Sequence, residues 1–288
     1  MRRLAFLSLT LSGLFWGLGF PLGELALRET DAAHMVLLRF AVAAVVALPF
    51  ALRRPDARAL FRSPVVLISG ALYGMAFLVQ FEGLARTSVT LAALLVGAMP
   101  ALIAVGAWAV GEHVTRASWV GVAAATLGAA VIAGLPSSAG SPLGIALSLG
   151  SLLIFLAWLL VLRHAPKSPT PMAIPAVTVI VAAATILPIA WLMHGPPKLA
   201  LSPGAWAGIV CQGVFCTLLA TAAWQFGLAR VGSASAAVFI NIEPLMGAII
   251  GVGLFGDHPT LALGVGGLLI VTGSFVVVRG ERERAVLV

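Results

Sequence analysis

The chain contains one long internal repeat, and this repeat restricts its fold more than any other feature. A shift of 144 residues aligns matching positions in the two halves of the chain. The matches are Gly83-Leu84-Ala85-Arg86 with Gly227-Leu228-Ala229-Arg230, Pro100 with Pro244 and, after one inserted residue, Gly121 with Gly266 and Gly128 with Gly273. Solenoid proteins repeat about every 20 to 50 residues, so a period of 144 residues predicts a duplicated domain. We place the two copies at residues 1–135 and 136–288.

The composition indicates a membrane protein. Hydrophobic residues make up 61% of the chain and charged residues only 9%, with a mean hydropathy of +1.10. Apolar segments of about 20 residues, long enough to cross a bilayer core, recur along the whole chain. We predict ten of them, at residues 4–25, 34–52, 64–85, 88–110, 117–135, 142–162, 171–193, 203–228, 234–255 and 259–278. The expected fold is therefore all-α and integral to the membrane, with ten transmembrane helices, five in each copy.

The basic residues predict the orientation of these helices. With the N-terminus in the cytoplasm, the cytoplasmic side carries Arg2, Arg3, Arg53, Arg54, Arg58, Arg62, Arg116, Arg163, Lys167, Arg230, Arg279, Arg282 and Arg284. The outer side carries only Arg28, Arg86 and Lys198. This asymmetry follows the positive-inside rule and places both termini in the cytoplasm. Because each copy has an odd number of helices, the second copy is expected to be inverted relative to the first.

Several classes of protein are disfavoured by what the sequence lacks. The basic residues are scattered over loops without an aromatic platform, which argues against nucleic-acid binding. The sequence has no Walker A motif, H-E-x-x-H motif or nucleophile elbow, so we expect neither direct use of ATP nor an enzyme. Cys211 and Cys216, on one predicted helix, favour neither a disulfide nor a metal site. We therefore expect no catalytic residue, no metal and no cofactor.

Polar and aromatic side chains at membrane depth are candidates for a functional site, because polar groups are costly there. Tyr73, Phe77 and Gln80 share one face of the third predicted helix, and simple aromatic packing is the alternative interpretation for Phe77. Trp16 and Trp158 lie well inside their helices, away from the interfacial belt in which Trp is common. The eighth and ninth predicted helices add Gln212, Thr217, Thr221, Trp224, Asn241 and Glu243.

Two prolines stand at corresponding positions of the copies. Pro100 and Pro244 each lack the N–H that a continuing helix needs, so each predicts a helix bend and a free carbonyl one turn earlier. Bent or broken helices at equivalent positions of two inverted halves point to a transport site near the middle of the membrane. Asn241 and Glu243, just before Pro244, are expected near the bilayer midplane, about 15 Å into their helix.

Three charged residues form a second predicted cluster nearer the outer face. Glu24 ends the first predicted helix, Arg39 lies about one turn into the second, and Glu82 lies near the end of the third. Because an Arg in the apolar zone favours a carboxylate partner, we predict that Arg39 pairs with Glu82 or Glu24 and helps to set an outer gate. For Glu24, a side chain that simply extends toward the lipid headgroups is the alternative.

In these motifs the chain resembles the drug/metabolite transporter superfamily, in its EamA-type branch. The matching stretches are Leu14-Phe15-Trp16-Gly17, Met99-Pro100 followed by Gly111-Glu112-His113, and Asn241-Ile242-Glu243-Pro244 followed by Gly256-Asp257-His258. The resemblance covers essentially the whole chain and is greatest to the YddG-like amino-acid exporters of bacterial inner membranes. In one departure, Asp257 stands where the family usually has Glu. The resemblance implies a central cavity lined by the first, third, fourth, sixth, eighth and ninth helices.

The predicted function is secondary transport that exports small metabolites, with amino acids of broad specificity as the substrates. The expected substrate-binding residues are Trp16, Tyr73, Phe77, Gln80, Met99, Trp158, Trp224 and Asn241. Aromatic rings and neutral amides suit small zwitterions with varied side chains. The alternatives are an exporter of cationic compounds, with Glu24 or Glu243 as the counter-charge, and a membrane enzyme or lipid flippase. The expected partners are the substrate and the lipid bilayer; the oligomeric state stays open, and a monomer is compatible with the sequence.

Overall fold

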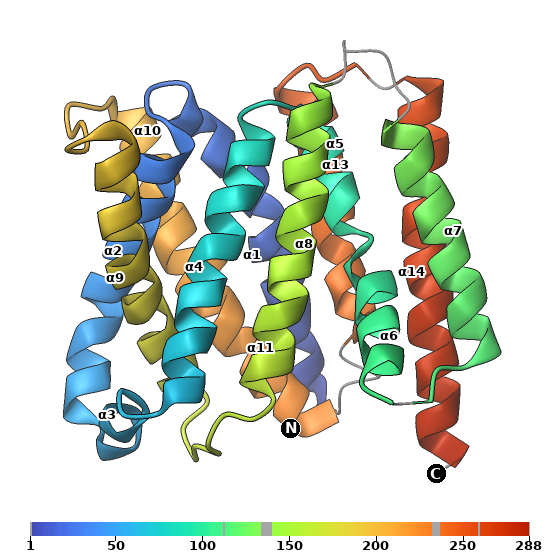
Figure 1. Ribbon diagram of the computed structural model, residues 1–288, viewed down its shortest axis with the longest axis horizontal. Helices are drawn as coiled ribbons and strands as arrows, with labels where there is room; N and C mark the ends of the chain where they lie inside the picture. Colours follow the sequence, from blue (N-terminus) through green and yellow to red (C-terminus); the bar gives the residue numbers. More distant parts are fainter. Residues whose placement is uncertain (1, 112, 134–139, 232–236, 259, 288) are drawn as a thin grey trace.

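The computed structural model describes the whole chain except residues 1, 112, 134–139, 232–236, 259 and 288. Within this part every named element is a helix (Figure 1). The elements are α1 (Arg2–Leu27), α2 (Ala32–Arg53), α3 (Pro55–Leu60), α4 (Pro64–Leu84), α5 (Val89–Val96), α6 (Met99–Ala109), α7 (Arg116–Ala133), α8 (Pro142–Leu162), α9 (Ala173–His194), α10 (Pro203–Cys211), η2 (Gln212–Leu219), α11 (Ala220–Val231), η3 (Ala237–Asn241), α13 (Ile242–Leu254) and α14 (Leu261–Leu287). The predicted boundary between the copies, at residues 135 and 136, lies outside the described residues.

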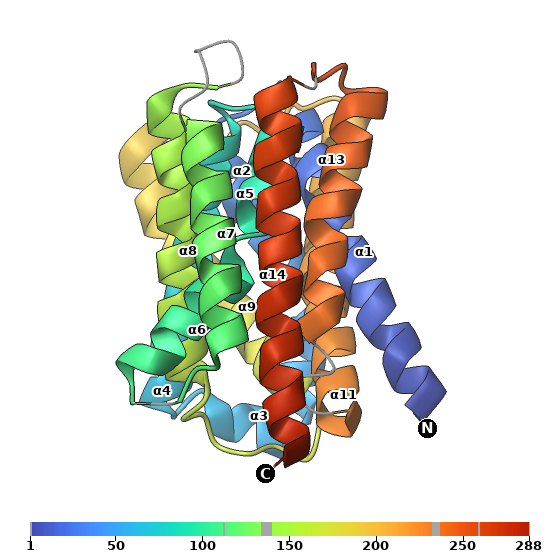
Figure 2. The same cartoon turned by 90° about the vertical axis from the view of Figure 1, so that its right-hand side faces the viewer.

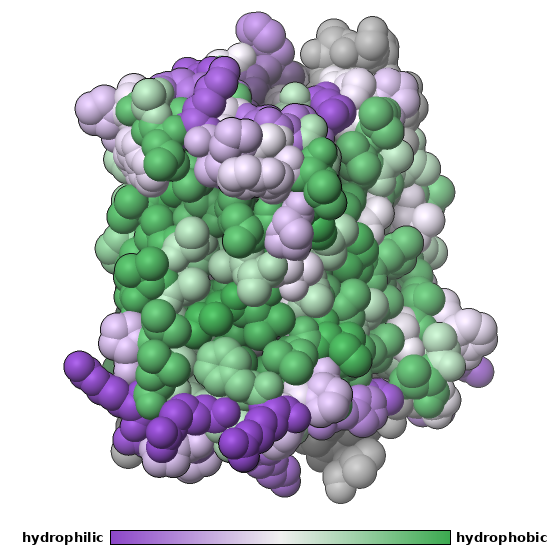
Figure 3. All heavy atoms as spheres, turned by 60° about the vertical axis from the view of Figure 1, so that its left-hand side comes forward, coloured by the Kyte–Doolittle hydropathy of each residue, from purple (hydrophilic) through white to green (hydrophobic). Residues whose placement is uncertain are grey.

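The helices have the lengths and composition of membrane spans. Among the described residues, eight helical stretches are long and apolar enough to cross a bilayer, and two shorter apolar helices lie at 116–131 and 239–254. The shorter two correspond to the predicted stretches 117–135 and 234–255, both of which extend beyond the described residues. Figure 3 shows a broad hydrophobic band across one face of the molecule, with hydrophilic residues at both ends. The protein is therefore a multi-pass membrane protein, and the count of ten spans stays a prediction.

Local sequence signals fix where the membrane helices begin. Asp31, Ser88, Ser141 and Ser202 each precede a helix and accept a hydrogen bond from the backbone N–H three residues later. This bond satisfies a donor that the helix itself leaves free. Proline occupies the first turn of α4, α8 and α10, where its missing N–H would have no partner within the helix.

Both predicted proline positions coincide with interruptions, but the local geometry differs from the prediction. Gly97 and Ala98 separate α5 from α6, and Pro100 stands in the first turn of α6. Pro244 stands in the first turn of α13, directly after the 3-10 helix η3. A proline in a first turn removes no hydrogen bond that the helix requires. The two prolines therefore begin new helices and do not bend continuous ones.

The predicted helix at 203–228 contains an element that the sequence did not indicate. Between α10 and α11, Gln212–Leu219 form a π-helix. Thr217 Oγ1 donates to the carbonyl of Gln212, five residues earlier, at 2.8 Å. Single stretches of π-helix within longer α-helices occur frequently at functional sites. Here the π-helix presents the Thr217 hydroxyl to α2.

The two halves of the chain pack against each other through several pairs of helices. The α4 helix packs against α8 and α9, α1 against α11 and α13, and α2 against α9. At one edge of the bundle α7 and α14 lie side by side (Figures 1 and 2). Their backbones approach closely at glycines: a Cβ on Gly273 would lie 2.6 Å from the carbonyl oxygen of Gly121, and a Cβ on Gly128 would meet the carbonyl of Gly266. Any larger side chain at these positions would force α7 and α14 apart.

Candidate transport cavity

A cavity of about 460 Å³ lies between helices of the two halves. Its wall comes from α1, α2, α4 and the α5–α6 region in the first half, and from α8, α9, η2, α11, η3 and α13 in the second. Small-molecule sites usually measure roughly 300–1,000 Å³. The cavity therefore has the size of a site for a small metabolite.

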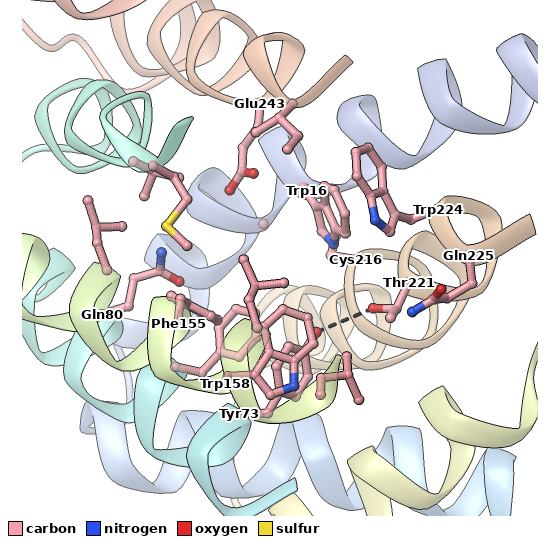
Figure 4. A pocket seen from close by; sticks show the side chains of 18 of the residues that line it. Trp16, Tyr73, Gln80, Phe155, Trp158, Cys216, Thr221, Trp224, Gln225 and Glu243 are labelled. Atoms are coloured by element: carbon pink, nitrogen blue, oxygen red, sulfur yellow. Dashed lines mark hydrogen bonds between the residues drawn. The ribbon is translucent and has the colours of Figure 1, made fainter. Parts of the chain in front are cut away.

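One wall of the cavity is aromatic and comes from α4 and α8 (Figure 4). The ring centroid of Tyr73 lies 4.9 Å from those of both Phe77 and Trp158. Phe155 meets Phe77 edge to face, with centroids 5.0 Å apart. Each aromatic pair at such a distance contributes about 1 kcal/mol beyond the area it buries. The wall is therefore a mutually supported cluster and not a set of loose side chains.

Further groups from α1 and α11 complete the lining. Trp16 and Trp224 form a second aromatic pair, with ring centroids 5.4 Å apart. The hydroxyl oxygens of Tyr73 and Thr221 lie 3.3 Å apart and join α4 to α11, as the dashed line in Figure 4 marks. The cavity thus presents aromatic faces together with a few polar groups, a combination that suits small amphipathic molecules.

Polar groups of the lining without a partner in the described part of the chain include Glu243, Trp158 and Arg39. Glu243 supplies the one carboxylate of the described lining and makes no hydrogen bond or ion pair there; Figure 4 shows its carboxylate pointing into the open space. The indole N–H of Trp158 and the Nη1 of Arg39 are buried without a hydrogen-bond partner. Because buried polar groups normally find partners, these three are available to a ligand or to another conformation.

Arg39 closes one end of the cavity. Its side chain is buried, and its Nε and Nη2 donate to Thr217 Oγ1 at 3.2 and 2.7 Å. The guanidinium carbon lies 4.2 Å from the ring centroid of Phe77 and 5.1 Å from that of Phe81. Cation–π contacts of this kind contribute about 2 kcal/mol when they are desolvated. A charge on α2 is thus held by side chains of α4 and of the π-helix.

Two neighbouring contacts complete this closed end. Gln212 Nε2 donates to the carbonyl of Gly19 at 2.7 Å, which joins the π-helix to α1. Phe20 of α1 stacks on Phe81 of α4, with ring centroids 6.4 Å apart. Gly19, Phe20, Phe81 and Gln212 are all buried, so packed side chains close this end of the cavity.

The opposite end of the cavity is open. Its lining there includes Arg163, Pro166 and Lys167, which follow α8 and are exposed to solvent. The N- and C-termini lie toward the same face of the molecule (Figure 1). The conformation is therefore closed toward one face of the membrane and open toward the face of the termini.

The structure brings most of the predicted substrate-binding residues into one place. Seven of the eight line the cavity, namely Trp16, Tyr73, Phe77, Gln80, Met99, Trp158 and Trp224. Asn241 does not line it: its amide is buried, and neither Nδ2 nor Oδ1 has a partner among the described residues. Asn241 ends the 3-10 helix η3, and Glu243, in the first turn of α13, lines the cavity. The binding role of the seven stays a prediction.

The predicted ion pair of Arg39 with Glu24 or Glu82 is wrong for this conformation. Glu24 lies 3.8 Å from Arg28, and Glu82 pairs with Arg86, in each case four residues further along the chain. Each carboxylate thus has its own basic neighbour near the membrane surface, while Arg39 is held by the hydroxyl and rings described above. Equal depth in the membrane did not imply contact, because the helices face in different directions.

Sequence reasoning missed Phe155. It placed Glu243 near the midplane and considered it as a counter-charge for the cationic alternative, but did not include it among the expected substrate-binding residues. A signal for Phe155 was present, because Leu152, Phe155, Leu159 and Leu162 recur at helical spacing on α8 and all line the cavity. A purely apolar stripe, however, looks the same whether it faces a cavity, the lipid or the packed interior.

On the closed face, acidic residues in the loops are held by hydrogen bonds. Burial acts to raise the pKa of Asp31, but the backbone N–H of His34 at 2.9 Å and its Nδ1 at 2.7 Å, with nearby histidine charge, hold that pKa below its usual value. His34 Nε2 lies 3.0 Å from the carbonyl of Gly195, which ties the start of α2 to the end of α9. The hydroxyl and N–H of Ser202 hold the pKa of Glu29 below its usual range.

Metal binding finds no support in the geometry. Among the described residues, no three His, Cys, Asp or Glu side chains are grouped so that they could hold a metal ion. Cys211 and Cys216 are free thiols. That the protein needs no metal or cofactor stays a prediction.

The chain is similar to several transporters over most of its length. The chain is 27% identical to a probable terminal-alkyne amino-acid exporter of Streptantibioticus cattleyicolor, over 96% of this chain and 95% of that protein. It is 25% identical to the uncharacterized transporter YyaM of Bacillus subtilis, over 90% and 88% of the two chains. It is 22% identical to an uncharacterized transporter of Archaeoglobus fulgidus, over 98% and 100%.

A solved structure and a family model extend this similarity over nearly the whole chain. A crystal structure with 18% sequence identity matches 98% of this chain and 99% of its own, with a TM-score of 0.69, which shows a common fold. The model of the EamA-like transporter family matches residues 3–134 and, a second time, residues 142–279. The predicted resemblance is confirmed, and the chain belongs to the EamA-like transporter family.

Proposed function

We propose that the protein is a secondary transporter that exports small metabolites, chiefly amino acids of broad specificity, across the bacterial inner membrane by alternating access. The observation that carries the proposal is the cavity between the two halves, closed at one end by buried side chains and open at the other. A channel in its conducting state would be open at both ends. A transporter that works by alternating access has one-sided states of this kind, with the site near mid-membrane.

The open end of the cavity is proposed to face the cytoplasm. It lies on the side of the termini, where α3 and the segment after α8 also lie (Figure 1). Arg54, Arg58, Arg163 and Lys167 belong to these segments. The positive-inside rule assigns such a side to the cytoplasm. In this orientation the conformation receives its substrate from the cytoplasm, as an exporter requires.

The two halves, residues 1–135 and 136–288, are proposed to be inverted repeats. The family model matches the chain once in each half. Gly121 contacts Gly273, and Gly128 contacts Gly266. In the repeat, Gly121 corresponds to Gly266 and Gly128 to Gly273. Replacing each glycine by its counterpart therefore turns one contact into the other. In the same way α4 packs against α8, while the counterpart of α4 in the second half, which ends in α11, packs against α1. A two-fold relation between the halves requires reciprocal contacts, so these contacts support it.

Amino acids are proposed as substrates on the chemistry of the lining. The faces of Trp16, Tyr73 and Trp158 accept apolar side chains and interact favourably with an ammonium group. Gln80 offers both a donor and an acceptor, and Glu243 offers an acceptor. The relative named as a probable amino-acid exporter supports this class of substrate.

Transport by the purified protein in liposomes tests the proposal. We expect the wild type to exchange several apolar and aromatic amino acids, and Trp158→Ala and Gln80→Ala to lose at least about tenfold in rate, which corresponds to one lost interaction of about 1.4 kcal/mol. Trp191→Ala is the matched control, because Trp191 is 55% exposed and outside the cavity lining. A wild type that carries no amino acid would contradict the substrate class, and unimpaired cavity variants would place the site elsewhere.

Export of cationic compounds is the second candidate, because the carboxylate of Glu243 lines the cavity without a partner. The same liposomes distinguish the two functions. Transport of a lipophilic cation such as tetraphenylphosphonium, without transport of amino acids, would favour the second candidate. Amino-acid transport that the cation does not inhibit would exclude it.

A further inference from the structure

The carboxylate of Glu243 is the feature of the cavity that neither the fold nor the packing explains. Glu243 lies in the first turn of α13, a helix of 13 residues and so about 20 Å long. Since a bilayer core is about 30 Å thick, a carboxylate at the buried start of this helix lies deep in the membrane. An ionised group there costs several kcal/mol unless a cation or a proton neutralises it.

No neighbouring side chain neutralises Glu243 by direct contact in the described part of the chain. The elements packed against α13 are α1, α5 and η3. The α5 and η3 segments contain no titratable residue, and the carboxylate of α1, Glu24, lies near Arg28 instead. Across the cavity, Arg39, Tyr73 and Cys216 are near enough to act on Glu243 electrostatically.

Arg39 is the one cation among these groups, and it makes no ion pair with Glu243. Two of its nitrogens are bonded to Thr217, and its guanidinium lies over the ring of Phe77. No carboxylate oxygen lies within 4.0 Å of it among the described residues. The other basic residues of the lining, Arg163 and Lys167, lie at the open end.

We infer that Glu243 is a cation site shared in turn by a proton and by the ammonium group of the substrate, so that one proton enters the cell for each amine that leaves. This inference rests on the proposed function and adds the coupling ion to it. On the open side the Glu243 carboxylic acid releases its proton to water, and the carboxylate binds the ammonium. After the cavity opens to the other side, the ammonium leaves and the carboxylate takes a proton from that side.

The surroundings of Glu243 suit an ammonium group. In Figure 4 the carboxylate points into the space that Trp16 also borders, with Trp224 beside it. An indole face attracts a cation most strongly among the aromatic side chains. The Glu243 carboxylate and an indole face therefore attract an amine, and the same carboxylate repels a second carboxylate, so Glu243 selects substrates by their amino group.

Proton release on ligand binding tests this inference. The purified protein, in weak buffer with a pH indicator, is mixed with phenylalanine, with phenethylamine, which lacks the carboxylate, or with phenylpropionate, which lacks the amine. We expect the wild type to release protons with the first two ligands and not with the third. We expect Glu243→Gln to release none and to bind phenylalanine at least about tenfold more weakly, as the loss of one charge-assisted contact implies.

Two further variants separate coupling from folding. Glu243→Asp keeps the carboxylate and is expected to restore proton release. Glu29→Gln makes the same isosteric change at an exposed carboxylate outside the cavity, whose pKa the Ser202 hydrogen bonds hold below its usual range, and is expected to behave as the wild type. If Glu243→Gln unfolds, the Asp variant and the three-ligand comparison in the wild type still decide the result.

The outcomes that overturn the inference differ from those that overturn the proposed function. Phenylalanine binding without proton release, release that persists in Glu243→Gln, or equal binding of phenylpropionate would each remove Glu243 from the coupling role while leaving amino-acid export intact. A wild type that neither binds nor carries any amino acid would remove the proposed function itself.

Discussion

The two ends of the cavity differ in how their side chains are held. At the closed end Arg39, Phe77 and Phe81 are buried and in contact with one another, and Thr217 fixes the cation from the second half of the chain. At the open end the lining is exposed, as at Lys167. The closed end thus depends on one buried cation, one hydroxyl and a few rings. Such a small set of contacts can separate without unfolding any helix, which alternating access requires.

Removing the cation at the closed end is expected to have the largest effect. Arg39→Ala deletes the hydrogen bonds to Thr217 and the contact with Phe77, so we expect most transport to be lost and the free energy of unfolding to fall by roughly 2 kcal/mol. Liposome transport and thermal unfolding in detergent measure the two effects. Arg39→Lys keeps the positive charge but not the planar guanidinium. Its transport rate and stability should therefore lie between those of the wild type and Arg39→Ala. Unchanged transport and stability in Arg39→Ala would show that this end is not held by Arg39.

Removing the acceptor of that cation is expected to have a smaller effect. Thr217→Val leaves Nε and Nη2 of Arg39 without their partner in a buried site, which costs about 1–2 kcal/mol. Thr217→Ser keeps the hydroxyl and serves as the control. Thermal unfolding of both variants, alone and combined with Arg39→Ala, measures the coupling between the two residues. If the effects of Thr217→Val and Arg39→Ala simply added, the two side chains would not act as one contact.

On the loops of the closed face, the charge of Asp31 is expected to contribute about 1 kcal/mol or less. Asp31→Asn keeps an acceptor for the start of α2 but loses the charge beside His34, whereas Asp31→Ala loses both. Because the pKa of Asp31 is below its usual 3.8, the charge stabilises the fold above that pH and ceases to do so as the pH falls through the lower, folded value. The melting temperatures of the wild type and Asp31→Asn should therefore differ at neutral pH and converge in acid. A difference in melting temperature that grows in acid would contradict this prediction.

At the open end the expected effect is the smallest. Lys167 is exposed at the mouth of the cavity, so Lys167→Gln should change the free energy of unfolding by less than about 0.5 kcal/mol. Thermal unfolding measured beside Arg39→Ala gives the contrast directly. A loss of stability as large as that of Arg39→Ala would mean that the two ends are held alike.

Much of the fold could be predicted from the sequence because helix starts and apolar lengths are local properties. The stretch predicted at 142–162 is α8, Pro142–Leu162, which Ser141 caps and Pro142 begins. Six of the seven predicted lining residues could be found for a related reason: an aromatic or amide group at mid-membrane depth needs an explanation even without a structure. The seventh, Met99, was expected from its place beside Pro100 and from the family resemblance.

The remaining features depend on contacts between helices that no local pattern records. The partner of Arg39 is Thr217, which a π-helix turns toward α2, and neither the π-helix nor the direction of the side chain follows from residue type. Asn241 was expected to bind substrate but does not line the cavity, whereas Glu243 does, and the sequence did not indicate the 3-10 helix directly before α13. Depth in the membrane could be counted along the chain, but rotation about a helix axis could not.

The sidedness of a single cysteine tests alternating access most directly. Met99 lines the cavity at the α5–α6 interruption, and the chain has only two cysteines, Cys211 and Cys216, which can both be replaced by Ser. In that background, Met99→Cys is treated with a membrane-impermeant maleimide, applied to intact cells or to everted vesicles. Alternating access predicts labelling from the cytoplasmic side in the conformation described here, and from the outer side when an amino-acid gradient drives the transporter outward. Labelling from both sides at once, or from one side under every condition, would contradict it.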